Sequence, residues 1–421
     1  MPKSAPELPL RREQPTGPRP LDGVRVIDFT RVLAGPFGTQ ILGDLGAEVI
    51  KIENPVGGDD TRMLGPEPGY GGESSFFMSL NRSKQSVAID LKCEAGREVV
   101  LDLLATADVL VENFAGSVMH RYGLDYASLK ERFPKLIFCS VSGYGRSGSN
   151  ADAAGYDTPL SAESGNTALN AFAGGDPVLG AIPYTDISTA LNSAIGVLAA
   201  LHARNHTGRG QHVDVAMYDA WLANLSFLGA GFLATGVEPR LNTPRTAGPS
   251  GLWETADGQI TVTCGKEKMF AAFCHRVVER SDWLEDPRFA NIQDRMKNEI
   301  AFFEELGVIL KSQPSAYWSE RCKRAGVPCG ELRSAGQALL SPEANECGLV
   351  FALLHPVAGT TPVIAQPVQF SDTPCQYGVP PLLGQHTRQV LTELLGYSEA
   401  RIAELESAGA ITCKSIEGAE A

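Results

Sequence analysis

One carboxylate stands at the beginning of an apolar helix pattern. The stretch from position 182 reads IPYTDISTALNSAIGVLAALHARNHTGRG and places Asp186 at the mouth of a predicted buried helix. Aspartate is a common N-cap, as are the neighbouring Thr185 and Ser188, and the positive end of a helix favours a carboxylate. The same place suits a nucleophile, because backbone N–H groups there can stabilise an oxyanion formed on a thioester. The local sequence leaves both hypotheses open.

Other motifs indicate less chemistry. GYGRSG at 143–148 has the G-x-G-x-x-G spacing after a predicted strand, but a loop-like sequence follows where a dinucleotide fingerprint would open a helix. A nicotinamide-dependent dehydrogenase is therefore the weaker hypothesis. None of the seven histidines lies in H-E-x-x-H or beside a G-x-S-x-G elbow. The nine cysteines form no C-x-x-C pair, which predicts no metal site and a reducing, cytoplasmic location.

The charge balance argues against two classes of partner. With 36 basic and 49 acidic residues the net charge is −13, which repels nucleic acid and anionic membranes. Residues 1–20 are proline-rich without an apolar core, and they are predicted to be a flexible arm, not a secretory signal. Residues 220–237 carry no charge, but they contain polar residues and glycines and have acidic flanks, so no membrane span is predicted.

Short β-branched runs alternate with helix patterns in the first part of the chain. Strands are predicted at 24–29, 47–53, 86–91, 108–114 and 136–144. This rhythm predicts an α/β fold with a Rossmann-like, mostly parallel sheet covered by helices. Ligands bind such sheets at the carboxyl ends of the strands, so candidate binding residues are expected directly after each strand.

From about residue 240 the pattern changes to a smaller α+β domain. GLWETADGQITVTCG predicts a hairpin that turns at Asp257–Gly258, and amphipathic helices are predicted at 268–280 and 295–312. The predicted organisation is a flexible N-terminal arm at 1–20, a discontinuous large α/β domain at 21–225 and 325–421, and a connector with the small domain at 226–324.

Several motifs together resemble CoA-transferase family III, the group that includes formyl-CoA transferase and the carnitine CoA-transferases. Among them are LDGVRVIDFTRVLAGPFGTQILGDLGAEVIKIE, LNRSKQSVAIDLK, LIFCSVSGYG and ALHARNHTGRGQHVDVAMYDA, in this order and spacing. The resemblance covers nearly everything after position 20. It implies an enzyme that passes CoA from an acyl-CoA to a small carboxylic acid, without a metal. It also implies a homodimer of interlocked, ring-like subunits in which the partner covers residues 220–237.

In that family the aspartate at the position of Asp186 is the nucleophile. The resemblance implies that its carboxylate attacks the donor thioester and that the reaction passes through a covalent aspartyl-CoA thioester. Contacts to CoA are implied in the loops after the strands, at Arg31, Val32, Leu33, Ala34, Asn54, Ile89, Asp90, Leu91, Lys92, Asn113, Phe114, Arg121, Ser142, Gly143 and Tyr144.

The side chains of Arg31, Lys92 and Arg121 are the expected partners of the CoA phosphates. Two positions depart from formyl-CoA transferase, since Asn54 and Ser142 stand where that enzyme has Arg and Lys. The sequence favours no particular donor or acceptor acid.

The resemblance leaves two alternative functions to consider and points to one further loop. α-Methylacyl-CoA racemases are related, but the histidine of their G-H-D stretch is Tyr156 in GYD here. A tyrosine with a pKa of about 10 is a poor general base at neutral pH, which favours transfer over racemisation. The alternative from another class is a non-catalytic CoA-binding protein. TAGPSG at 246–251, with Gly248 and Gly251, resembles a short form of the glycine loop that shields the aspartyl intermediate.

Overall fold

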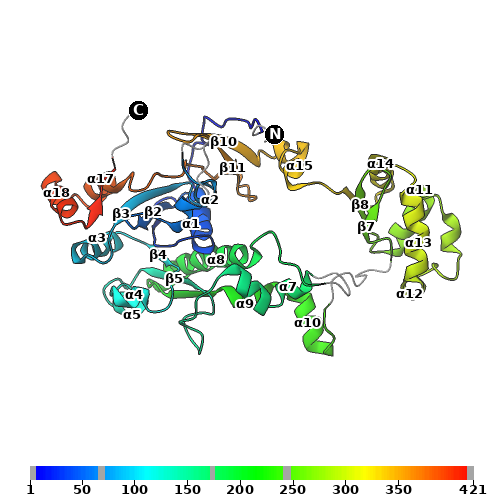
Figure 1. Ribbon diagram of the computed structural model, residues 1–421, viewed down its shortest axis with the longest axis horizontal. Coiled ribbons are helices and arrows are strands. Elements are labelled where there is room, and N and C mark those ends of the chain that lie inside the picture. The colour runs from blue at the N-terminus through cyan, green and yellow to red at the C-terminus, as the bar shows by residue number, and fades with distance from the viewer. Residues whose placement is uncertain (1–5, 65–71, 171–175, 240–247, 415–421) are drawn as a thin grey trace. The chain divides into compact units, whose positions relative to one another are not determined.

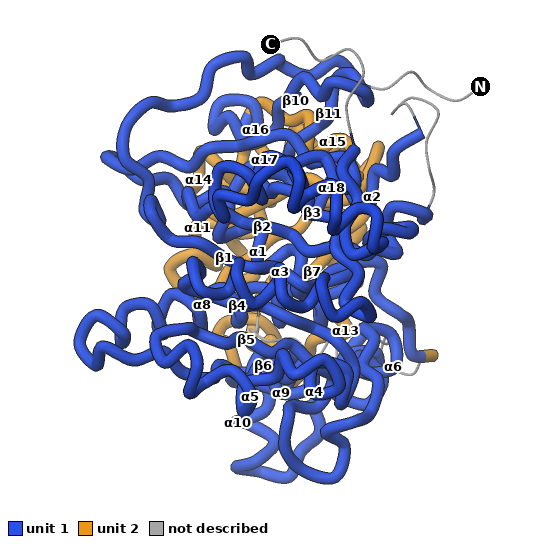
Figure 2. Tube along the Cα trace, turned by 90° about the vertical axis from the view of Figure 1, so that its left-hand side faces the viewer, with its two compact units in different colours: residues 1–170, 177–239, 343–421 blue, residues 171–176, 240–342 orange. Residues whose placement is uncertain are grey.

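The computed structural model describes residues 6–64, 72–170, 176–239 and 248–414 (Figure 1). The chain divides into two compact units (Figure 2). Unit 1 comprises residues 1–170, 177–239 and 343–421, and unit 2 comprises residues 171–176 and 240–342. The domain boundaries drawn from the sequence stay a prediction, because compactness within one chain does not show which parts fold independently.

A seven-stranded sheet forms the centre of unit 1. Its order is β12-β3-β2-β1-β4-β5-β6, and all pairings are parallel except that of β12 with β3. The predicted α/β fold with a mostly parallel sheet is therefore confirmed. The strands are β1 (Arg25–Asp28), β2 (Glu48–Glu53), β3 (Lys84–Ile89), β4 (Val109–Glu112), β5 (Ile137–Ser142), β6 (His212–Ala216) and β12 (Ile411–Thr412).

Helices cover both faces of this sheet (Figure 1). The helices of unit 1 are α1 (Ala34–Asp44), α2 (Ser75–Leu80), α3 (Glu94–Leu104), α4 (Val118–Arg121), α5 (Tyr126–Leu129), α6 (Asp157–Glu163), α7 (Asn166–Leu169), α8 (Tyr184–Thr207), α9 (Met217–Asn224), α10 (Ser226–Thr235), α17 (Thr387–Gln389) and α18 (Glu399–Ser407), with α16 (Pro342–Glu346) at the junction of the units. Val26 points into a core with α1 and α8, and Ile27 points into a core with α3 and α18. Successive strand residues face opposite sides of the sheet. Because both faces are covered, both sets of side chains are buried and the strand sequences are continuous apolar runs.

The described part of the N-terminal arm lies against a hairpin of unit 1 made of β10 (Val350–His355) and β11 (Gly359–Ile364). Leu10 forms a parallel bridge with Ala352, and the N–H of Arg11 donates to the Ala352 carbonyl over 2.9 Å. The Arg11 guanidinium lies 4.0 Å from the centroid of the Phe351 ring. These contacts fix the position of this stretch of the arm on unit 1.

The uncharged run at 220–237 falls on two short helices. α9 ends at Asn224 and α10 begins at Ser226, where the backbone has a φ of +46°. No residue of α10 is buried by the chain itself. Within the described ranges, no helix is long and apolar enough to cross a membrane.

Unit 2 contains an antiparallel sheet of β7 (Gly251–Glu254), β8 (Gln259–Val262) and β9 (Cys329–Glu331). β7 and β8 pair across the predicted Asp257–Gly258 turn, so that hairpin is confirmed. The helices are α11 (Glu267–Arg276), α12 (Ile292–Lys297), α13 (Glu299–Leu310), α14 (Ser315–Ala325) and α15 (Ala335–Leu339).

The single helix predicted at 295–312 is wrong. Asn298 separates α12 from α13 with φ −110° and ψ 28°, and its side-chain amide donates to the Asp294 carbonyl over 2.9 Å. A side chain that satisfies the last carbonyls of α12 competes with helical pairing there. Of the predicted shielding loop, residues 246 and 247 lie outside the described residues, and Gly251 opens β7.

Candidate active site

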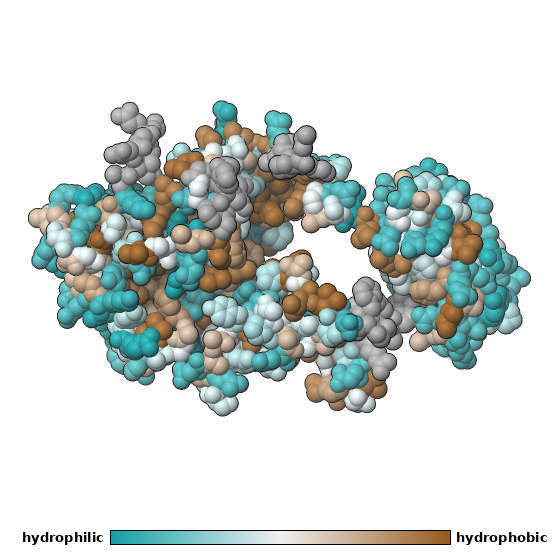
Figure 3. Space-filling view, in the orientation of Figure 1, coloured by the Kyte–Doolittle hydropathy of each residue, from teal (hydrophilic) through white to brown (hydrophobic). Residues whose placement is uncertain are grey.

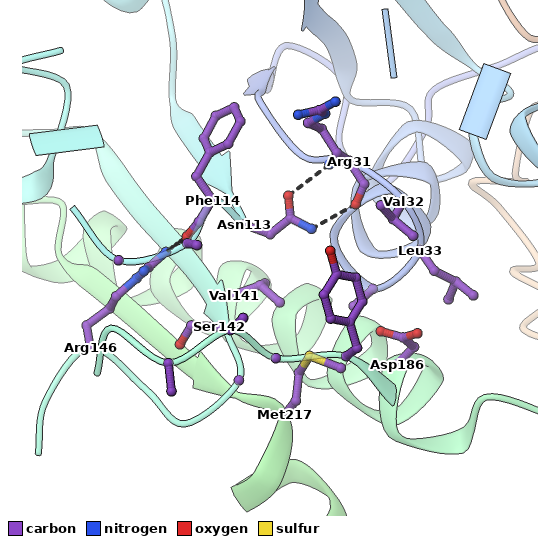
Figure 4. Close-up of a pocket in the computed structure, with 18 of the residues that line it drawn as sticks. Arg31, Val32, Leu33, Asn113, Phe114, Val141, Ser142, Arg146, Asp186 and Met217 are labelled. Atoms are coloured by element: carbon purple, nitrogen blue, oxygen red, sulfur yellow. Dashed lines mark hydrogen bonds between the residues drawn. The ribbon is translucent and has the colours of Figure 1, made fainter. Parts of the chain in front are cut away.

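Two adjacent cavities open in unit 1 at the carboxyl ends of the parallel strands. The first has a volume of about 220 Å³ and is lined by the loop after β1, the ends of β4 and β5, residues 153–156, Asp186 and Met217 (Figure 4). The second has a volume of about 370 Å³ and follows the ends of β1, β2 and β3 to α4. Arg31 and Phe114 line both cavities, so one extended ligand could occupy the two together.

Asp186 is the third residue of α8 and not its N-cap. The cap residue is Pro183, which supplies no side-chain hydrogen bond. The backbone N–H groups of Thr185 and Asp186 donate to Oδ1 of Asp157 instead, over 3.0 and 3.3 Å. The N-cap hypothesis for Asp186 is therefore wrong. Its carboxylate lines the first cavity and accepts no hydrogen bond from any residue that the structure describes.

The position of Asp186 makes its carboxylate unusually basic. Burial penalises the charged form, and the negative charge of Asp157 adds to that penalty, so the pKa of Asp186 rises from 3.8 to about 7. A carboxyl group with a strongly shifted pKa on the wall of a cavity is typical of a functional site.

The loop after β1 carries backbone strain beside the cavity. Val32 has a φ of +70°, a conformation that is rare for a β-branched residue. The Asn113 side chain clamps the preceding peptide: its Oδ1 accepts from the N–H of Arg31 and its Nδ2 donates to the Arg31 carbonyl, each over 2.8 Å (Figure 4). The N–H of Val32 donates to Asp59 over 3.2 Å. The surrounding side chains thus hold a strained conformation in place.

A buried network of charged side chains binds the loop after β1 to the end of β2. Nζ of Lys51 lies 3.0 Å from Oδ2 of Asp59, with both side chains almost completely buried, and it donates to the Thr30 carbonyl. Burial opposes ionisation of Asp59, but the Lys51 ammonium and hydrogen bonds from Thr61 outweigh it and lower the pKa of Asp59 to about 2. The pair therefore stays ionised and ties β2 to the loop after β1.

The segment GYGRSG closes one side of the first cavity. A Cβ on Gly155 would lie 2.3 Å from the Cα of Gly143, so this close approach of two backbones requires glycine. Nη2 of Arg146 donates to both Glu112 oxygens, over 2.7 and 2.9 Å, and to the Phe114 carbonyl over 2.8 Å. Residues 143–148 form bends and open no helix, unlike a dinucleotide-binding turn.

Comparison with known protein families identifies the family of the chain that carries this site. The sequence model of CoA-transferase family III matches residues 21–387. The chain belongs to CoA-transferase family III. It is accordingly a CoA-transferase, and the resemblance described from the motifs is confirmed.

Relatives of this CoA-transferase are similar over most of their length. The human succinyl-CoA:glutarate CoA-transferase is 35% identical over 396 residues, covering 93% of this chain and 90% of the relative. The acetyl-CoA:oxalate CoA-transferase of Acetobacter aceti is 39% identical over 327 residues, covering 77% of this chain and 83% of the relative. A solved CAIB/BAIF family protein from Brucella suis has a TM-score of 0.79 at 34% identity, covering 90% of this chain and all of the other.

Most residues that were predicted to contact CoA line the two cavities of this CoA-transferase. The first cavity takes Arg31, Val32, Leu33, Ala34, Asn113, Phe114, Ser142 and Gly143. The second takes Arg31, Asn54, Ile89, Asp90, Leu91, Lys92, Phe114 and Arg121. Tyr144 lines neither, and its hydroxyl donates to Glu163 over 2.6 Å. That these residues bind CoA stays a prediction.

Sequence reasoning missed several charged residues at the cavities. Lys51 and Asp59 line the second, and Asp60 lines the first. One signal was present, because a lysine inside the apolar strand EVIKIE must find a buried partner. The described residues contain no cluster of three or more His, Cys, Asp or Glu side chains able to hold a metal ion.

Proposed function

We propose that this CoA-transferase moves CoA from an acyl-CoA donor to a carboxylic acid through a covalent aspartyl-CoA thioester on Asp186. One observation carries the proposal: the Asp186 carboxylate lines the first cavity and accepts no hydrogen bond from the described residues, while Asp157 caps the helix α8. A carboxylate that neither caps nor pairs is free to attack. At neutral pH a pKa of about 7 leaves a large share of it ionised.

The chemistry consists of four acyl transfers that balance without an outside proton. An Asp186 oxygen attacks the donor carbonyl, which forms a mixed anhydride and breaks the C–S bond to release CoA thiolate. The thiolate attacks Cγ of Asp186, which forms the aspartyl thioester and releases the donor acid as a carboxylate. The acceptor carboxylate then attacks Cγ, forming a second anhydride and releasing the thiolate. Attack of the thiolate on the acceptor carbonyl gives the product and restores the Asp186 carboxylate.

We propose that CoA lies along the second cavity with its thiol end in the first. The cavities share Arg31 and Phe114, and Lys92 and Arg121 bring positive charge to the second. A local positive charge is needed to hold phosphates on a chain with a net charge of −13. Water must be kept from the anhydride and thioester, since hydrolysis would end the exchange.

We propose short dicarboxylic acids as the acceptors. The two relatives described above carry glutarate and oxalate in their names. Both are dicarboxylates, and transfer between two acids of similar pKa is nearly thermoneutral.

We propose that the active form is an interlocked homodimer. Large apolar side chains on α8, α10 and the residues after it are exposed in the single chain, among them Leu191 (47%), Ile195 (62%), Leu233 (85%) and Val237 (69%). Figure 3 shows apolar atoms gathered over α10 at the bottom of the view. An apolar surface of this kind is typical of a subunit interface. Sedimentation at low micromolar concentration should give a dimer, and a stable monomer would contradict the proposal. The cytoplasmic location stays a prediction.

The decisive experiment combines a substrate panel with detection of the covalent adduct. Acetyl-, succinyl- and formyl-CoA are offered with oxalate, succinate and glutarate, and the products are read by mass spectrometry. Incubation with acyl-CoA should leave CoA on the peptide that contains Asp186, and hydroxylamine should remove it. Asp186→Asn should lose transfer by several orders of magnitude while CoA still binds. Asp219→Asn, an exposed aspartate on α9, is the matched control and should keep both adduct and transfer.

Near-native transfer by a folded Asp186→Asn would overturn the aspartyl mechanism. CoA binding by the wild type without transfer across the panel would favour a protein that only binds CoA.

A further inference from the structure

Asp157 occupies an unusual place between two helices. It is the first residue of α6, yet its carboxylate serves the start of α8, where Oδ1 accepts the N–H groups of Thr185 and Asp186 over 3.0 and 3.3 Å. The first N–H groups of a helix have no partner within the helix, and a side-chain oxygen normally comes from the N-cap residue. Here Pro183 is the N-cap and supplies none.

A side-chain contact joins the two helices beside this interaction, and further hydrogen bonds hold its two partners in place. The hydroxyls of Ser161 on α6 and Thr185 on α8 lie 2.9 Å apart, and both side chains are buried. Nδ2 of Asn166 donates to the Ser161 hydroxyl over 3.4 Å, and the hydroxyl of Thr189 donates to the Thr185 carbonyl over 2.7 Å. Asp157 therefore approaches α8 from a fixed direction, and a carboxylate in this place is part of the packing.

The negative charge of Asp157 acts on Asp186, whereas the arginines at the first cavity are paired with other carboxylates. Among the cavity residues, Arg31 is paired with Asp60. Arg146 is paired with Glu112. The other titratable groups on elements packed against α8 are Asp44 of α1, bound to Arg82, Cys139 of β5, Glu163 of α6, bound to Tyr144, His212 and Asp214 of β6, and Tyr218 and Asp219 of α9. The charge that acts on Asp186 is that of Asp157.

We propose that Asp157 is the positioning residue of the nucleophile. It binds the first turn of α8 and turns the Asp186 carboxylate toward the cavity, and its negative charge makes that carboxylate a stronger attacking group. The proposal rests on the nucleophilic role of Asp186 proposed above.

A cap from another helix suits this task better than a local one. A Ser at position 183 would satisfy the same N–H groups but would bring no charge close to Asp186. An attacking carboxylate gains from higher basicity, as Brønsted relations describe, and a like charge close by raises basicity. Asp157 thus joins a structural and an electrostatic function in one side chain.

Two substitutions separate these functions. Asp157→Asn keeps an oxygen that can accept from Thr185 and Asp186 but removes the charge. Asp157→Ala removes both the oxygen and the charge. Asp219→Asn removes one negative charge from α9 without touching the cap, and it is the matched control.

The readouts are the pH profile of aspartyl-adduct formation and the ¹³C NMR titration of labelled aspartate, with Asp186→Asn to assign the Asp186 signal. In Asp157→Asn both midpoints should move to lower pH by about one unit, since a like-charge interaction is removed. Asp157→Ala should show a comparable shift and, in addition, faster hydrogen exchange of the amides of residues 185 and 186. Asp219→Asn should match the wild type in both readouts.

Unchanged midpoints in a folded Asp157→Asn would overturn the proposal, whatever its transfer rate. The same holds if Asp219→Asn shifts them equally. The NMR titration does not depend on turnover. If the wild type forms no adduct while the Asp186 signal still moves in Asp157→Asn, the proposed mechanism fails and the interaction of the two aspartates stands.

Discussion

Replacement of Asp186 by asparagine should make the protein more stable at neutral and alkaline pH. The wild-type carboxylate must ionise in a site where burial and Asp157 oppose its charge, which raises the pKa of Asp186 to about 7. Asparagine has nearly the same shape and no charge, so it removes that penalty. Such an electrostatic cost to folding is expected at a functional site, because groups selected for reactivity are often poorly solvated.

The sign and size of this change in stability follow from the pKa of Asp186 in the folded and in the unfolded state. Below pH 3.8 the carboxyl group is protonated both folded and unfolded, so it contributes nothing to the pH dependence. Between pH 3.8 and about 7 the folded state holds the proton and the unfolded state has lost it, so stability falls as pH rises. Above pH 7 the full penalty applies. A shift of about three pKa units corresponds to about 4 kcal/mol as an upper bound, and about 2 kcal/mol is expected after relaxation of the site.

The assay is urea unfolding of wild type and Asp186→Asn at pH 4, 6 and 8, followed by circular dichroism. The variant should gain little at pH 4 and about 2 kcal/mol at pH 8. Asp219→Asn should show no such pH-dependent difference, because this aspartate is exposed. A difference between wild type and Asp186→Asn that stays constant from pH 4 to 8 would refute the assigned burial and charge of this group.

Three other expectations follow from the same site. Val32→Gly should be about 1 kcal/mol more stable than Val32→Ala in urea unfolding, since only glycine relieves the φ of +70°; equal stability would show that the loop is unstrained. Lys51→Met should cost about 3 kcal/mol or more, because it leaves Asp59 charged and buried, whereas Lys92→Met at an exposed position should change stability by less than about 0.5 kcal/mol. In heavy water, 2-methylacyl-CoA should take up no deuterium at Cα, because Tyr156 replaces the histidine of the related racemases; exchange at the rate of turnover, measured by mass spectrometry, would support a racemase.

The sequence alone determined five strands of the sheet and the edge at which to search, whereas β6 and β12 were not predicted. Apolar β-branched runs that alternate with helix patterns have few arrangements besides a parallel sheet with helices on both faces, so β1 to β5 were predicted close to their observed bounds. Since the carboxyl ends of parallel strands meet at one edge, residues such as Asn54 and Asn113 could be placed together although they are far apart in the chain.

Only the tertiary structure decided what each charged side chain does. Asp186 and Asp157 are separated by 28 residues of sequence that include no regular pattern to bring them together, and packing of α6 on α8 makes one the cap of the other's helix. The sequence shows Lys51 within an apolar strand, but only the folded chain brings Asp59 to it as a buried ion-pair partner. Hydrophobic periodicity reports local burial, whereas the partner of a buried charge depends on contacts between distant segments, and no local pattern encodes those contacts.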